Sequence, residues 1–158
     1  MPVKPPEWVP FGHRGKYPHM ARHDVRIWER FIDRFAGNFD DAAYDLALGG
    51  SETLDPNASD AERLMWRFNT AKRVDALARN REEIWLCEVR PGSGLSAIGA
   101  VLGYLHLSEL DKWADRPLIP TIVTDHTDQD THLVCDHLGI QLIELPEPEL
   151  EGPIGGAS

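Results

Sequence analysis

The sequence contains little of what marks a membrane, secreted or disulfide-rich protein. No apolar run approaches the roughly 20 residues that a membrane-spanning helix needs. The opening "MPVKPPEWVP" has no apolar stretch of the kind found in secretory signals. The only two cysteines, Cys87 and Cys135, both lie inside apolar patterns. We therefore expect buried, reduced thiols, a cytosolic origin, no membrane partner and no export through a signal peptide.

Positive charge is also scarce. Lysine and arginine number 16 against 26 acidic residues, which gives a net charge of −10. This balance argues against broad non-specific binding to nucleic acid, because neutralised phosphates supply most of that affinity. The charge is uneven: residues 1–23 carry an excess of basic side chains, and residues 141–158 carry four glutamates and no base. Either copies or partners make contact through these opposite ends, or both ends are solvated.

Residues 1–23 are predicted to form an extended arm. The stretch "MPVKPPEWVPFGHRGKYPHM" holds five prolines, which block regular helices and strand ladders. Its large aromatic residues, Trp8, Phe11 and Tyr17, are unfavourable to leave in water. We expect the arm to lie in a groove, either on this chain or on a neighbouring copy. Residues 146–158 are predicted to form an acidic tail rich in proline and glycine.

Residues 24–145 are predicted to form one domain of alternating helices and strands. Helical spacing of apolar residues follows Asp24, a candidate N-cap, and Ser59 with Glu62 forms a capping box for a second helix. The predicted helices are 24–36, 59–67, 93–110 and 128–138; the predicted strands are 44–49, 72–78, 83–90, 118–125 and 140–145. This order predicts the α/β class, a mixed sheet flanked by helices, with extended arms at both ends.

Three charged residues are predicted to meet at one end of the hairpin formed by 72–78 and 83–90. With a turn centred on Asn80 and Arg81, Asp75 lies opposite Leu86 and diagonal to Glu88 on the same face. Alternation along the strand places Arg90 on the face of Glu88. Two adjacent carboxylates repel unless a cation lies between them, and either Arg90 or a divalent metal would serve. Mg²⁺ favours such carboxylates.

The stretch "KRVDALARNREEIWLCEVR" resembles the core of the PD-(D/E)XK nuclease superfamily. Together with "YPHMARHDVRIWERFI" and "EVRPGSGLSAIGAVLGY", it is also similar to small uncharacterised phage-encoded proteins of this fold. The resemblance implies a restriction-endonuclease-like fold with Asp75 and Glu88 as Mg²⁺ ligands. Glu29, on the first helix, would be a further ligand or orienting acid. These four residues, Asp75, Glu88, Arg90 and Glu29, are the predicted catalytic set.

The sequence departs from the family pattern at two places. Arg90 stands where the motif has lysine, and we expect no polar side chain from the following helical stretch, "AIGAVLGY", where such nucleases often have glutamine. An arginine fork favours a bidentate pair with a carboxylate over the approach of a compact ammonium to water. Arg90 is therefore predicted either to close a salt bridge over an inactive site or to stand in for the lysine.

Two functions follow from the resemblance. The first is a phage virion or assembly component with a degenerate nuclease fold, at the head–tail connector or neck. Its partners would be other virion proteins, or copies of itself bound through the arm. The second is a Mg²⁺-dependent DNA endonuclease that processes phage DNA, with DNA as its partner. The expected location is the virion or the host cytoplasm.

Overall fold

The computed structural model describes residues 2–149 and contains one six-stranded mixed sheet with four helices, which confirms the predicted α/β class. The strands are β1 (Val9–Pro10), β2 (Asp41–Leu48), β3 (Lys72–Arg79), β4 (Ile84–Val89), β5 (Leu118–Thr124) and β6 (Gln141–Glu144). The helices are α1 (Arg22–Phe35), α2 (Asp60–Thr70), α3 (Leu95–Asp111) and α4 (Gln129–Leu138). Within the described residues, no helix is both long enough and apolar enough to cross a membrane.

The strands follow one another across the sheet in chain order. The first four are antiparallel neighbours, whereas β4–β5 and β5–β6 are parallel pairs. Antiparallel neighbours need only short turns, while each parallel pair needs a crossover, which α3 and α4 supply. The C-terminal end of β4 therefore lies directly before α3, next to the end of β5.

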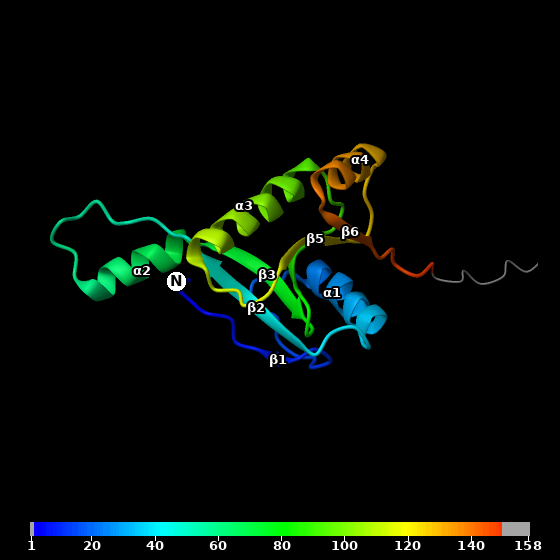
Figure 1. The fold of residues 1–158 in the computed structure, drawn as a ribbon, viewed down its shortest axis with the longest axis horizontal. Helices are drawn as coiled ribbons and strands as arrows, with labels where there is room; N and C mark the ends of the chain where they lie inside the picture. The colour runs from blue at the N-terminus through cyan, green and yellow to red at the C-terminus, as the bar shows by residue number, and fades with distance from the viewer. Residues whose placement is uncertain (1, 150–158) are drawn as a thin grey trace, which may run out of the picture.

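Helices α1, α3 and α4 cover the two faces of the sheet in separate layers, whereas α2 extends from one end of the sheet (Figure 1). On one face, α1 buries Trp28 and Phe31 against small sheet residues such as Ala76 and Ala78. On the other face, α3 packs on apolar residues of β2, β3 and β4, and α3 with α4 packs on β5. The amphipathic spacing of α1 predicted its buried face, because every third or fourth position faces the sheet.

The arm packs on its own chain. Phe11 and Tyr17 are 3% and 6% exposed within the core on the α1 face, and the Arg79 guanidinium lies 4.0 Å from the centre of the Trp8 ring. The expectation that no part of the arm is regular was wrong at β1, where Pro10, which has no amide hydrogen, ends a short edge strand on β2. All three aromatic side chains therefore make contacts within their own chain.

Several boundaries differ from the sequence prediction. Helix α1 begins at Arg22 with Ala21 as N-cap, and Asp24 instead accepts a hydrogen bond from the Ala21 amide at 3.0 Å. Strand β2 begins at Asp41 rather than 44, because pairing with β3 extends through Ala42 and Ala43. The Ser59 capping box of α2 is confirmed. Of the predicted tail, residues 150–158 lie outside the described residues.

Candidate functional site

The β3–β4 hairpin sets the position of the two candidate carboxylates. Its loop comprises residues 80–83, where the Asn80 side chain accepts hydrogen bonds from the amides of the two glutamates that follow it in the loop. The register pairs Leu77 with Leu86, and one more step beyond the Ala76–Cys87 pair places Asp75 across from Glu88. The predicted pairing of Asp75 with Leu86 was wrong, since the asparagine turn moves the centre of the loop by one residue.

Asp75 lies where the regular alternation of β3 breaks down. Ala76 packs on the α1 face, while both Val74 and Leu77 pack on the α3 face. The Arg90 amide donates to β5, so the neighbouring Val89 amide points towards β3, where it donates to Asp75 Oδ2 at 2.8 Å. The Asp75 carboxylate therefore replaces a backbone carbonyl as the acceptor for the Val89 amide at the end of the β3–β4 ladder. The alternation of side chains along a strand does not by itself predict this structural role.

Glu88 is buried, and protein donors contact both of its carboxylate oxygens. The residue is 5% exposed; Arg90 Nη2 lies 2.6 Å from Oε1, and the Tyr104 hydroxyl donates to Oε2 at 3.0 Å. The second Arg90 nitrogen, Nη1, donates to Ser96 Oγ at 2.7 Å. The guanidinium is thus held between β4 and the first turn of α3, and it neutralises the buried charge of Glu88.

The charge of Glu88 affects the ionisation of Asp75. Burial, followed by the negative charge of Glu88 and a smaller effect of Asp24, raises the pKa of Asp75 to about 7. The Val89 amide and Arg90 act in the opposite direction but do not outweigh these effects. Burial and the neighbouring Glu88 also raise the pKa of the Tyr104 phenol, which stays protonated and donates its hydrogen bond. Near neutral pH, Asp75 is therefore a carboxyl poised between its neutral and charged forms.

The structure brings together Asp75, Glu88 and Arg90 but not Glu29. Glu29 accepts a hydrogen bond at 3.1 Å from Arg14 of the arm, on the exposed side of α1. The α1 carboxylate that acts on Asp75 is Asp24, near the start of the helix. Glu29 therefore lies apart from the other three predicted residues and contacts the arm instead.

Sequence reasoning also missed two side chains of α3. Tyr104 lies in "AIGAVLGY", which seemed to have no polar contribution, yet its hydroxyl bonds Glu88. Ser96 on the first turn of α3 bonds Arg90. Eight residues are a little over two turns, so Ser96 and Tyr104 lie on the same half of the helix surface, about 80° apart around its axis. That spacing was the available signal.

The donor set does not fit a bound Mg²⁺ in this arrangement. Mg²⁺ takes six oxygen ligands in near-octahedral geometry. Here Arg90 and Tyr104 contact the Glu88 oxygens, and Asp75 Oδ2 accepts a backbone amide. Within residues 2–149, no three His, Cys, Asp or Glu side chains cluster so that they could hold a metal ion. Metal binding by Asp75 and Glu88 stays a prediction that requires Arg90 to leave Glu88.

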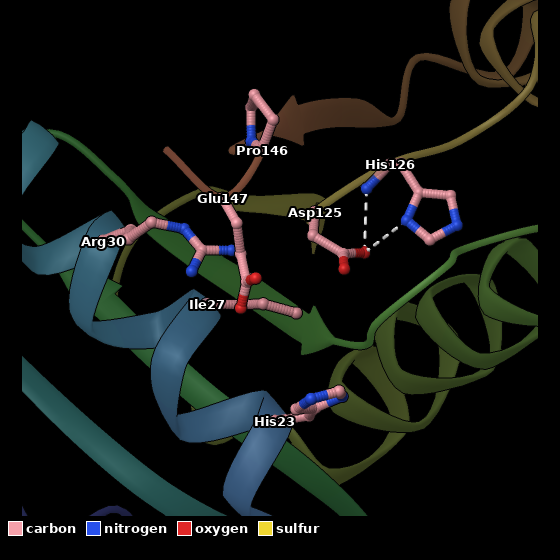
Figure 2. Close-up of a pocket in the computed structure, with 7 residues that line it drawn as sticks. All are labelled: His23, Ile27, Arg30, Asp125, His126, Pro146 and Glu147. Carbon is pink, nitrogen blue, oxygen red and sulfur yellow. Dashed lines mark hydrogen bonds and ion pairs between the residues drawn. The ribbon is translucent and has the colours of Figure 1, made fainter. Parts of the chain in front are cut away.

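A cavity of about 290 Å³ lies between α1 and the loop that follows β5 (Figure 2). Asp125 Oδ1 accepts hydrogen bonds from the amides of Gly92 and His126, at 2.7 and 2.8 Å, and so ties the loop after β4 to the loop after β5. Arg30 donates twice to the Leu145 carbonyl. Asp125 therefore connects the two loops, whereas Asp128 is the N-cap of α4.

Comparisons with known proteins give the fold but no function. No family model matches the chain, and no curated protein matches it. Among solved structures, the chain is similar to AF1548, a protein of unknown function, with a TM-score of 0.50 and 16% identity. The match covers 80% of this chain and 61% of AF1548, so the chain spans less than two thirds of that protein. At this identity the likeness concerns the fold alone.

Proposed function

We propose that this chain is a phage virion or assembly component that keeps a PD-(D/E)XK nuclease-like fold without nuclease chemistry. The observation that carries the proposal is the contact of Arg90 with Glu88 at 2.6 Å. The guanidinium lies against the carboxylate that the resemblance assigns to the metal, and its charge takes the role of the cation there. The phage setting, and a place at the head–tail connector, come from the resemblance of the sequence to small phage-encoded proteins.

Two further observations support a structural role for the same residues. Asp75 completes the hydrogen bonding of the Val89 amide, and Tyr104 joins Arg90 in satisfying Glu88. Buried polar groups that find partners within the protein hold neighbouring elements in register. In the proposed protein, the former catalytic carboxylates connect β3, β4 and α3 instead of binding a metal.

The alternative function is a Mg²⁺-dependent DNA endonuclease. The specific observation in its favour is the pairing of Asp75 with Glu88, whose charge contributes to the raised pKa of Asp75. Paired carboxylates with perturbed pKa values are common in catalytic sites. This function requires Arg90 to swing away from Glu88 when metal and DNA bind, because a cation and the guanidinium cannot both occupy the same contact.

A cleavage and metal-binding experiment separates the two functions. Purified protein is incubated with plasmid and single-stranded DNA in Mg²⁺ or Mn²⁺, and Mn²⁺ binding is measured by titration calorimetry without DNA. We expect the wild type neither to cut nor to bind Mn²⁺. Arg90→Lys is the informative variant, since lysine reaches less far and leaves a Glu88 oxygen accessible. Cleavage by the wild type that disappears in Asp75→Asn would overturn the proposal.

The virion role has its own test. The chain is sought by immunodetection in purified particles of the phage that encodes it, with a soluble early phage protein as the control for contamination. We expect a fixed number of copies per particle. Absence from particles, with abundant protein in the infected cell, would contradict a virion role and leave the enzyme as the better explanation.

A further inference from the structure

Helix α2 carries an apolar surface that the described chain does not cover. Leu64, Met65 and Trp66 are 59%, 65% and 50% exposed, and α2 has no buried residue. Leu54, in the loop before the helix, is 99% exposed. Figure 1 shows α2 and this loop extending from one end of the sheet, away from α4. Leu64 and Met65 share one side of α2 with Ala61 and Phe68, at spacings of three and four residues, whereas Trp66 lies on another side of the helix. Large exposed apolar side chains grouped on one side of a helix are typical of an interaction surface.

The chain holds α2 in place by its ends rather than by its face. Ser59 and Glu62 form the capping box, and Arg67 Nε donates to the Gly49 carbonyl at 3.1 Å. Val3 of the arm borders a shallow groove beside Leu64 and Met65, but both side chains stay exposed. An isolated helix of 11 residues is marginal in water. Burial of its apolar face against a partner would stabilise it.

The charges at the two ends of α2 indicate which partner fits. The first turn carries Asp60 and Glu62, while the last turn carries Arg67, with the exposed Lys72 just beyond. Two copies of this helix packed antiparallel would bring each acidic end against the basic end of the other and would also align the helix dipoles favourably. An anionic membrane or nucleic acid is a poorer partner, because the chain carries a net charge of −10.

We propose that the chain forms a symmetric dimer in which α2 of one copy packs antiparallel on α2 of a second copy. The apolar contact is made by Leu64 and Met65, with Ala61 and Phe68 on the same side of the helix. The inference rests on the proposed assembly role, since it names a second copy as a partner. It replaces contact through the arm, whose aromatic side chains are already packed on this chain.

The first test is the oligomeric state of the full chain. Light scattering after size exclusion, over a hundredfold range of concentration, is expected to show a dimer that dissociates on dilution. Leu64→Glu is expected to raise the dissociation constant at least tenfold. Leu133→Glu is the matched control, because Leu133 on α4 has the same exposed fraction of 59% and lies outside the proposed interface. Circular dichroism checks that both variants are folded.

The second test is the direction of the helices. Met65 lies at the middle of α2, so Met65→Cys meets its own copy across an antiparallel pair, whereas Ala61→Cys, one turn from the start, does not. Under oxidation we expect a covalent dimer for Met65→Cys only; Cys87 and Cys135 are buried and serve as internal controls. Cross-linking of both variants would indicate parallel helices and overturn the geometry.

Other outcomes overturn the proposal itself. A wild type that stays monomeric at all concentrations, or a dimer that Leu64→Glu leaves intact, excludes the α2 interface. Binding of the wild type to vesicles of anionic lipid, lost in Leu64→Glu, would assign the same face to a membrane. The oligomeric state is measured without DNA or metal, so its result is independent of the cleavage experiment. A dimer that cuts DNA would refute the assembly role but not the interface.

Discussion

Replacement of Asp75 by asparagine is expected to stabilise the protein at alkaline pH. The folded state raises the pKa of this carboxyl from 3.8 to about 7, so the folded state holds a proton that the unfolded chain has already lost. The stability of the wild type therefore falls as pH rises between about 4 and 7, and it stays at the lower value above that. Asparagine is neutral throughout, and its side-chain carbonyl can still accept the hydrogen bond from the Val89 amide.

The size of the effect follows from the pKa difference. Each pKa unit corresponds to about 1.4 kcal/mol, so a rise of about three units sets an upper limit of about 4 kcal/mol. Asp75 is partly exposed, and water near the carboxylate reduces the penalty to about 1–3 kcal/mol. Urea unfolding of the wild type and Asp75→Asn at pH 4, 5.5, 7 and 8.5 measures this difference directly. The two proteins should be nearly equal at pH 4.

Two controls make the result decisive. Asp75→Ala also removes the charge but leaves the Val89 amide without an acceptor, so it should gain less stability than Asp75→Asn. Asp125→Asn should act in the opposite direction. Burial favours a higher pKa for Asp125, but the Gly92 amide and His126 outweigh it and lower the pKa, so its charged form stabilises the fold above about pH 4. A loss of stability in Asp75→Asn at pH 8.5 would refute the reasoning.

The remaining predictions concern the ion pair, the arm and the base of α2, each read by urea unfolding at pH 7. Arg90→Met keeps an unbranched apolar stem but removes the guanidinium and leaves the Glu88 carboxylate without its cation, and we expect a loss of about 1–3 kcal/mol; an unchanged stability would mean that the pair is unimportant. Phe11→Ala should cost about 3 kcal/mol, because the ring is 3% exposed in the core; a cost under 1 kcal/mol would contradict packing of the arm on its own chain. Gly50→Ala should cost about 2 kcal/mol or more, since φ is +97° and the added Cβ would lie 2.4 Å from the Arg67 carbonyl oxygen; Gly37→Ala, where the added Cβ meets nothing within 4 Å, is its control.

Most of the helices and strands could be predicted because their signals are local. The capping box at Ser59 and the left-handed Gly139 after α4 lie within a few residues of the ends that they mark. The hairpin prediction was wrong by one step in its register, because the Asn80 side chain organises a turn centred one residue later. Asp75 and Glu88 are still brought together, since the predicted turn and the observed turn both place them near the same end of the two strands.

The partners of the candidate site depend on contacts between distant segments. Glu88 meets Tyr104 only because α3 packs back over the sheet, and the α1 carboxylate that acts on Asp75 is Asp24, whereas Glu29 contacts the arm. Side-chain alternation also fails at Asp75 itself, where the carboxylate accepts the Val89 amide. The spacing of these residues along the chain does not determine which of them contact one another.

The amino-acid sequence alone determined the order of the elements, the meeting of two carboxylates and an arginine at one end of a hairpin, and the acidic character of the chain. The tertiary structure decided that Arg90 closes on Glu88, that the arm packs on its own copy, and that α2 leaves Leu64, Met65 and Trp66 exposed. The reason is physical. Periodicity and capping are set within one or two turns of chain, whereas burial and ion pairing depend on which segments the packing of the whole domain brings within a few ångströms.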